Sequence, residues 1–565
     1  MSASPVIRIA FAVSVAWLSA APIFARDNGN NGETPLVWSP VPASPPAWEA
    51  GPAAVPLAPQ VASGPCFATP NDGTTVFTGT AQAVRDALAA AVANGTVKMA
   101  GYCAGVAAQG GATQVVRITQ PLTLAGGYTT TDWMTYNPAG NPTTLDAQVG
   151  GRVISVSVAA TLRGFTVTGG YISSAVSQKG AGVNAAGALT LSDMIVSGNT
   201  ITGVASNSGG GAYAGGAASV SDTIFRNNKA NGSGGGIFAA SVLALTGTQF
   251  ISNTTSNVSS IGGGAYAQGA ATINGGLFQR NTAGGYAGGL LAASTLALSG
   301  TQFISNTTAS ATGEGGGAQA SGTATLDGGL FQGNSAGYGG GLLAFSALAL
   351  SGTQFVGNRA GANGGGLLAF STLALSGTQF VGNRAGANGG GLLVSSESAH
   401  RIVNALFAGN SAATNGAAIH VDAAAPLSLI HATIVSQTAP TGAKQAIYVV
   451  GGAVYLTNTL IATHTIGIAR AGGAVRDWNT LFAGVATPYS GTVTSAGGIT
   501  GTAGFVNPAA GDYHLGAGSA ALNAGIDAGV YTDFEGQARP FGAGFDIGYD
   551  EYFVGPRAYL PSVVR

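Results

Sequence analysis

The chain has 565 residues, of which only 7% are charged, 93 are glycine, and the formal net charge is −1. Because there is no basic excess to neutralise phosphates, this composition argues against nucleic acid as a partner. Apolar residues are interleaved with Gly, Ser, Thr and Asn, and the longest apolar stretch, residues 9–21, is shorter than the ~20 residues that cross a bilayer.

The N-terminus has the pattern of an export signal. Arg8 precedes the apolar stretch, and the small-residue site Ile23-Phe24-Ala25 follows it. This order predicts a secretory signal peptide over residues 1–25, cleaved near Ala25, with an uncleaved anchor as the alternative. We therefore expect a secreted or cell-surface protein with no transmembrane helix after cleavage.

Residues 26–65 are expected to form a linker. Nine prolines lie between Pro35 and Pro65, with Trp38 and Trp48 among them. Proline at this density favours extended geometry and prevents a packed core, so the segment is interpreted as a spacer.

Residues 66–150 are expected to cap a repeat array. Thr80 is a suitable N-cap for a helix over 81–93, and apolar strands follow it. The only two cysteines, Cys66 and Cys103, are predicted to form a structural disulfide, because an isolated pair in an exported chain pairs most simply with itself.

Residues 151–485 contain internal repeats. Residues 342–366 and 367–391 are identical except for Ala347 in the first copy and Thr372 in the second. An F-x-x-N signature recurs at intervals of 24 to 28 residues from Phe225 to Phe407, followed by a Gly-rich phrase. A fixed period of this length indicates stacked copies of one structural unit.

The repeats predict an all-β fold, a parallel β-helix with about three short strands in each coil. Apolar residues alternate within each copy, and no helix long enough for a crossover fits into 25 residues. Equivalent side chains then stack at the strand spacing of ~4.8 Å, which predicts an internal phenylalanine stack and a corner ladder of asparagine amides. The ladder residues are Phe250, Asn253, Phe278, Asn281, Phe303, Asn306, Phe331, Asn334, Phe355, Asn358, Phe380 and Asn383.

The GGG phrase alternating with F-x-x-N resembles the repeats of polymorphic outer-membrane proteins and the wider pectate-lyase-like superfamily. The front segment, beginning CFATPNDGTTVF at Cys66, and the tail, FVNPAAGDYHLGAGSAALNAG followed by DFEGQARPFGAGFDIGYDEY, are similar to exported β-helix proteins with a choice-of-anchor C-terminal module. The resemblance implies a right-handed parallel β-helix, export, a C-terminal capping module over 486–554 and a terminal tail over 555–565. It implies no activity.

Two pairs of charged residues recur on neighbouring coils and form a candidate ligand face. Asp193 and Asp222 lie three residues before their coil anchors and could share a cation, with exposed corner carboxylates as the alternative. Arg359 and Arg384 could hold an anionic sugar, although the duplication alone explains their repetition.

The remaining polar residues show no catalytic or metal-binding pattern. His400, His420, His431 and His464 occupy different positions in the repeat and are interpreted as isolated surface residues. The C-terminal acids are expected to form a capping loop in which Arg539 pairs with Asp546 or Asp533, with a Ca²⁺ loop as the alternative. These acids are Asp527, Asp533, Glu535, Asp546, Asp550 and Glu551.

Three functions remain open on the sequence. The first is a noncatalytic scaffold for adhesion or cell-envelope association, which contacts a polysaccharide or a surface protein and needs no cofactor or catalytic residue. The second is a carbohydrate-binding rod, which requires exposed aromatic residues in register; Tyr213 and Tyr266 lie two repeats apart, with no tyrosine between them. The third is a polysaccharide lyase or hydrolase, which requires a compact charged cluster on adjacent coils.

Overall fold

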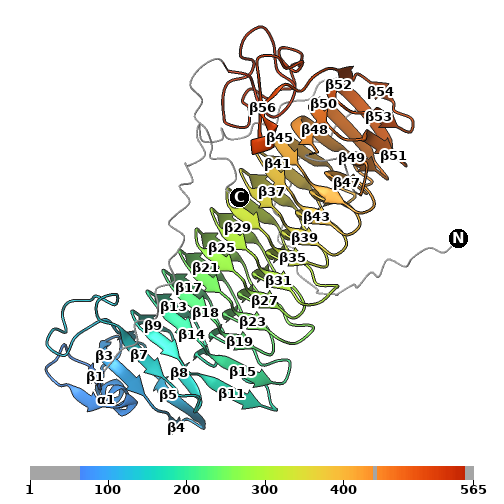
Figure 1. Ribbon diagram of the computed structural model, residues 1–565. Coiled ribbons are helices and arrows are strands. Elements are labelled where there is room, and N and C mark those ends of the chain that lie inside the picture. Colours follow the sequence, from blue (N-terminus) through green and yellow to red (C-terminus); the bar gives the residue numbers. More distant parts are fainter. Residues whose placement is uncertain (1–63, 437–441, 554–565) are drawn as a thin grey trace, which may run out of the picture. The chain divides into compact units, whose positions relative to one another are not determined.

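The repeats form a right-handed parallel β-helix of about 13 turns in the computed structural model of the protein (Figure 1). The structure describes residues 64–436 and 442–553. The predicted signal peptide, nearly all of the predicted linker and the predicted tail over 555–565 lie outside the described residues.

Each regular coil contains four short strands, one more than the sequence predicts. In one coil these are β20 (Ile237–Ala239), β21 (Leu243–Thr246), β22 (Gln249–Ile251) and β23 (Thr254–Thr255). The fourth is only two residues long and has no alternation of its own. Its strand character comes from parallel pairing with the neighbouring coils, which a single copy of the repeat does not reveal.

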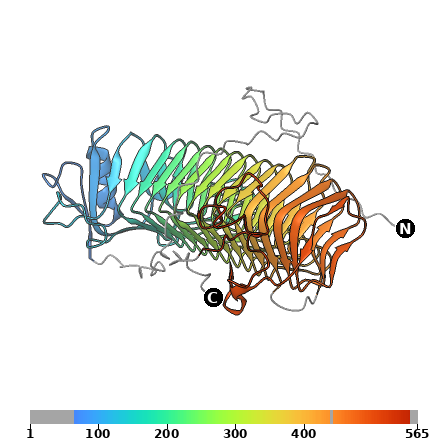
Figure 2. The same cartoon turned by 90° about the horizontal axis from the view of Figure 1, so that it is seen from above.

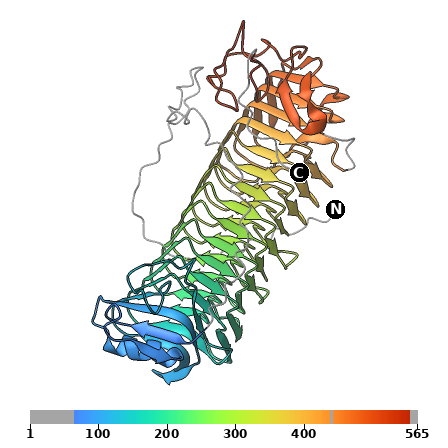
Figure 3. The ribbon, with the colours of Figure 1, turned by 60° about the vertical axis from the view of Figure 1, so that its left-hand side comes forward.

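Stacking of the coils produces three long parallel sheets, visible along the solenoid in Figures 2 and 3. Strands such as β21 and β22 lie in the largest, sheet A, which has 29 strands. Sheet B has 16 strands and contains β20, and sheet C has 10 strands and contains β23. Each residue of a strand pairs with the equivalent residue of the strand in the next coil. Side chains at one position of the repeat therefore form a row along the solenoid.

The core contains the predicted stack of phenylalanines. Eight rings from Phe225 to Phe407 lie one above another, with centroids 4.7–5.0 Å apart and planes within 12° of parallel. All eight side chains are fully buried. The strand spacing fixes this face-to-face arrangement, and burial of each ring stabilises the fold by roughly 1.5–3 kcal/mol.

The asparagine ladder runs beside the stack. The Nδ2 atom of Asn358 donates to Oδ1 of Asn383 at 2.9 Å and to the carbonyl of Phe331 at 2.7 Å. Its Oδ1 accepts from both the backbone N–H and Nδ2 of Asn334. The same bonds repeat from Asn199 to Asn410, so every ladder amide is satisfied although it is buried.

The GGG phrase is explained by conformation and by close contact. Gly364 has φ +67°, which an L side chain rarely adopts. A Cβ on Gly365 would lie 2.3 Å from the carbonyl oxygen of Gly390, and one on Gly366 would lie 2.6 Å from that of Gly391. The first glycine turns the corner, and the other two allow the next coil to approach.

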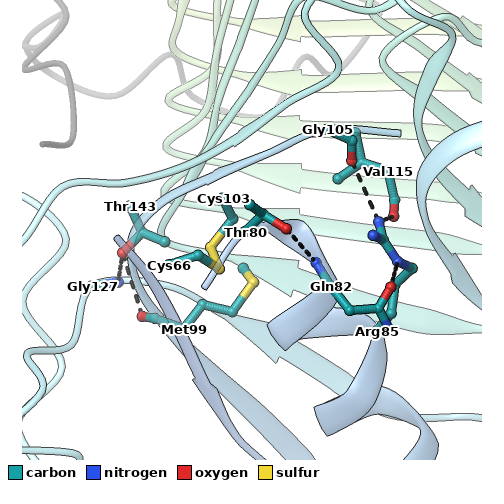
Figure 4. The surroundings of a disulfide bond; sticks show 10 residues. All are labelled: Cys66, Thr80, Gln82, Arg85, Met99, Cys103, Gly105, Val115, Gly127 and Thr143. Carbon is teal, nitrogen blue, oxygen red and sulfur yellow. Dashed lines mark hydrogen bonds between the residues drawn. A yellow bond between two sulfur atoms is a disulfide. The ribbon is translucent and has the colours of Figure 1, made fainter. Parts of the chain in front are cut away.

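The N-terminal end of the solenoid is covered by a cap. β1 (Cys66–Thr69) pairs antiparallel with β3 (Thr96–Ala104), and the predicted disulfide Cys66–Cys103 joins them (Figure 4). The helix α1 (Ala81–Ala90) buries Val84, Ala87 and Leu88 in the same core cluster as the coils. The cap therefore shields the open end of the stack from further strand pairing.

The helix is three residues shorter than predicted. Thr80 caps it as expected, through a hydrogen bond from the N–H of Gln82. At the other end Ala91 is extended, with ψ 145°, and its carbonyl accepts from the side chain of Gln120. The N–H of Asn94 donates to the carbonyl of Pro121, and these contacts lead the chain from the end of the helix through a turn into β3, which begins at Thr96.

In the last coils the two sheet A strands merge into single long strands. These are β45 (His400–Ala408), β48 (Leu427–Val435), β50 (Ala453–Ala462) and β52 (Ala474–Ala483). The C-terminal segment, with β56 (Phe505–Asn507) and β57 (Asp512–Leu515), packs an apolar cluster that includes Leu515 and Ile547 against them. We call residues 502–553 the C-terminal module.

Candidate functional site

The outward face of sheet B carries a column of three aromatic rings. Tyr213 on β16 (Ala212–Ala214), Phe238 on β20 and Tyr266 on β24 (Ala265–Ala267) occupy one register position. Their centroids are 5.0 Å and 4.9 Å apart. The two tyrosines stand out in the sequence, whereas Phe238 between them was not predicted; it fills the gap because any aromatic ring, not only that of tyrosine, continues the column.

A second aromatic pair lies further along the solenoid, at the corner that follows the sheet B strands. Phe345 and Phe370 directly follow β36 (Leu342–Ala344) and β40 (Leu367–Ala369), the sheet B strands of the duplicated coils. Their rings stack with centroids 5.4 Å apart and planes 11° from parallel, yet the side chains remain 41% and 39% exposed. Both phenylalanines occur in the duplicated phrase LLAFS. The alternation of apolar residues in that phrase did not show that these phenylalanines are exposed while the preceding leucines are buried.

An apolar row adjoins the exposed pair. Leu343, Leu368 and Leu393 form a separate cluster with the partly buried Tyr338. We call Tyr213, Phe238, Tyr266, Phe345 and Phe370 together the aromatic face; Tyr213 is only 7% exposed, Phe238 and Tyr266 are half-buried, and Phe345 and Phe370 are exposed. From β16 to β40 it covers six strand spacings, roughly 29 Å.

Lys179 contacts the first ring of the aromatic face, Tyr213. Lys179 Nζ lies 4.2 Å from the centroid of the Tyr213 ring and donates to its hydroxyl at 2.6 Å. This cation–π contact and hydrogen bond hold the first ring of the column in place.

The structure places Asp193 and Asp222 at equivalent corners of neighbouring coils. Both have positive φ, +53° and +47°, at a position where later coils have glycine, as at Gly247. Asparagine and aspartate tolerate this conformation better than other side chains, so the backbone explains their recurrence. Asp193 also accepts a hydrogen bond from the hydroxyl of Tyr136 at 2.9 Å, which ties a loop of the cap to the solenoid.

Arg359 and Arg384 lie on another face. They begin β39 (Arg359–Ala360) and β43 (Arg384–Ala385) in sheet C, pair in register with each other, and are exposed. Asp222 is five coils away, about 24 Å along the solenoid. The four charged residues of the predicted ligand face are therefore not brought together.

The four late histidines are buried, which corrects their interpretation as surface residues. His400 occupies a leucine position of the core, between Leu373 and Leu427, and is 2% exposed. His420 stacks on Tyr448 at 5.5 Å. Burial lowers the pKa of His400 and of His464 to about 4, so both rings are neutral at pH 7.

Arg539 pairs with a different carboxylate from the two predicted. Its Nη1 lies 3.0 Å from Oε2 of Glu551, and both side chains are fully buried. Its guanidinium also donates to the backbone carbonyls of Asp546 and Gly548. The Asp546 carboxylate instead accepts from backbone N–H groups, including that of Asn523 at 2.6 Å, and so closes the loops of the C-terminal module.

One cluster in the described chain has the composition of a metal site. The ligand atoms of His514, Glu535 and Asp550 lie within 4.8 Å of one another. However, Nδ1 and Nε2 of His514 lie 2.6 Å from carboxylates of Asp512 and Glu535. Burial alone would lower the pKa of His514, but these carboxylates and Asp550 outweigh burial and raise it to about 9. Because both ring nitrogens contact carboxylates, His514 forms a half-buried charged cluster with Asp512 and Glu535.

The chain matches no protein-family model, and no curated protein is significantly similar to it in sequence. Within 64–436 and 442–553, no helix combines the length and the apolar character needed to cross a membrane. The class of this protein is defined by its own structure, which is a parallel β-helix.

Proposed function

We propose that this protein is a secreted or surface-displayed, noncatalytic β-helix that serves adhesion or cell-envelope association by binding polysaccharide along its aromatic face. The exposed stack of Phe345 and Phe370 carries this proposal. Single exposed apolar residues are ordinary on protein surfaces, but two exposed aromatic rings stacked on neighbouring coils mark a contact surface.

Carbohydrate is the ligand that this geometry favours. The rings are held in rows by a rigid sheet, and the apolar face of a sugar ring packs against an aromatic ring. A polymer could contact the exposed Phe345 and Phe370 together with the half-buried Phe238 and Tyr266, so that several weak contacts add along one chain. This combines the scaffold and the carbohydrate-binding hypotheses from the sequence.

Surface display is a further part of this proposal. The resemblance of the repeats to those of polymorphic outer-membrane proteins, and of the C-terminal module to choice-of-anchor modules, supports surface display. The predicted signal peptide supports export. A surface protein remains the alternative partner.

Binding should be measured by affinity electrophoresis of residues 26–565 in gels that contain neutral or acidic polysaccharides. With the retarding polymer, the double variant Phe345→Ser/Phe370→Ser should bind at least about tenfold more weakly, since each ring buried in a complex contributes on the order of 1.5 kcal/mol or more. The matched control is Val176→Ser/Val258→Ser, which removes apolar side chains 65% and 78% exposed elsewhere.

Two results would contradict the proposal. Equal retardation of the double variant and the wild type would show that the aromatic face does not bind the polymer. Release of unsaturated uronates or new reducing ends from any polymer would favour the lyase or hydrolase hypothesis instead.

A further inference from the structure

The N-terminal cap contains a cavity of about 430 Å³ that is separate from the aromatic face. Its floor is the outward side of the first strands of sheet A: β3, β6 (Thr123–Ala125) and β9 (Ala160–Arg163). Its walls are the loop over 126–142 and the loop that follows β1. The volume lies within the range of small-molecule sites in proteins.

Two cations and one carboxylate line the cavity. Lys98, Ala125 and Arg163 occupy one register position on the three neighbouring strands, so the small alanine separates the two cations. Lys98 is already neutralised by Asp72, whose Oδ1 lies 2.6 Å from its Nζ, and it also donates to the carbonyl of Trp133. The lining therefore has a net charge of +1, and Arg163 is its unneutralised member.

Arg163 is half-buried and retains unused hydrogen-bonding capacity. Within the described residues no carboxylate lies within 4.0 Å of its guanidinium, and Nη2 makes its one hydrogen bond, to the hydroxyl of Tyr128 at 3.3 Å. Its Nε is buried without a partner in the same part of the chain. A partly desolvated cation of this kind favours an anion that can accept a planar pair of hydrogen bonds, as a carboxylate does.

Aromatic rings stand beside this cation. Arg163 lies 4.7 Å from the ring centroid of Tyr136, and the rings of Tyr136 and Tyr128 are 6.0 Å apart at 57°. Asp193 fixes Tyr136 through its hydroxyl, and Gly164 gives the ring room, since a Cβ there would lie 2.7 Å from that hydroxyl oxygen. Tyr128 is only 3% exposed and supports Tyr136 from behind, whereas Tyr136 is half-buried and lines the cavity. A cation beside such a positioned ring is suited to a ligand with both a carboxylate and an apolar ring face.

We propose that this cavity binds a single carboxylated sugar unit, a uronate, with its carboxylate on Arg163 and its ring against Tyr136. The inference goes beyond the proposed function, because the cavity lies on sheet A within the cap and the aromatic face lies on sheet B. Either site can fail its test without affecting the other.

Isothermal titration calorimetry on residues 26–565 tests the assignment with four probes. D-galacturonate should bind at least about tenfold more tightly than methyl β-D-galactopyranoside, which lacks the carboxylate, and than acetate or inorganic phosphate, which lack the ring. Equal binding of acetate or phosphate would show a simple anion site and overturn the sugar assignment. Equal binding of the neutral galactoside, or no binding of galacturonate, would overturn the role of Arg163.

Two kinds of variant complete the test. Arg163→Gln should weaken galacturonate binding by at least about tenfold, whereas Arg359→Gln, an exposed arginine on sheet C, should not change it. Because loss of Arg163 could disturb the cap, Thr96, which lines the cavity, offers an independent route. Thr96→Glu places a competing carboxylate inside and should abolish binding, while Thr96→Gln, similar in size and uncharged, should retain more of it. If Thr96→Glu binds galacturonate as the wild type does, the proposed site is wrong.

Discussion

Each interior asparagine of the ladder satisfies buried groups on the coil before its own and on the coil after it. Asn358 accepts from the backbone and side chain of Asn334, and it donates to Asn383 and to the carbonyl of Phe331. The amide is fully buried, so no water can replace these bonds. The recurrence of asparagine therefore follows from hydrogen bonding between coils rather than from a ligand.

Asn358→Leu should lower the melting temperature. The substitution leaves several buried polar groups unsatisfied on the adjacent coils, at a cost of ~1–3 kcal/mol for each. Thermal unfolding followed by circular dichroism measures the effect. Asn274→Leu is the matched control, because Asn274 is exposed on a strand and outside the ladder. If both variants melt at the wild-type temperature, the ladder does not stabilise the solenoid.

At the scale of elements, the C-terminal module and the last coils respond to pH in opposite directions. The pKa of His514 is raised to about 9 by its carboxylate partners, although burial opposes this. Its contribution to the free energy of unfolding is therefore complete below pH ~6.5 and is lost as pH rises through about 9. His464 has its pKa lowered to about 4 by burial, so its titration destabilises the coils only as pH falls below ~6.5.

The variant His514→Gln should be less stable than the wild type at pH 7, and this difference should shrink as the pH approaches 9.5. The contribution of His514 is about 1.4 kcal/mol for each tenfold difference in proton affinity between the folded and unfolded states. Chemical denaturation at pH 5, 7, 8.5 and 9.5 measures it. In His464→Gln the difference from the wild type should instead change between pH 6.5 and 4. A His514→Gln penalty that is constant from pH 7 to 9.5 would show that His514 is not held as a cation.

The coils were predictable because their information is periodic. The F-x-x-N and GGG phrases specify a stack, a ladder and a corner, and each repetition adds the same evidence. The short fourth strand and the extended Ala91 were not predictable, because their conformations depend on pairing with residues far along the chain. Strand identity is decided by these neighbours more than by local preference.

The candidate sites were harder to predict for a related physical reason. Phe345 and Phe370 have the same residue type as the buried stack, and only their position after the sheet B strand places them outside. The cavity in the cap brings Lys98 and Arg163 together through two strand pairings, and no motif joins them in sequence. The C-terminal acids were recognised as a group, but the choice of Glu551 as the partner of Arg539 depends on how the loops fold back.

At the scale of the whole molecule, the duplicated coils provide a natural deletion. Leu342, Phe355 and Asn358 pair in register with Leu367, Phe380 and Asn383. Removing residues 342–366 joins Gly341 to Leu367, and Gly341 is the register equivalent of Gly366. The deletion therefore restores the same junction and the same contacts between coils, and shortens the solenoid by one strand spacing of ~4.8 Å.

This deletion should preserve the fold, with a melting temperature within about 5 °C of the wild type, because the stability of a repeat array is approximately a sum over neighbouring units. Removing residues 342–353 instead leaves half a coil, shifts every later strand out of register, and should prevent cooperative folding.

In affinity electrophoresis the one-coil deletion loses Phe345 but keeps Phe370 and the column from Tyr213 to Tyr266. A surface of additive weak contacts should then bind more weakly yet measurably, whereas a catalytic groove across these coils would lose its alignment altogether. Complete loss of polysaccharide binding by a well-folded deletion variant would contradict the distributed aromatic face and point to a single site within the duplicated coils.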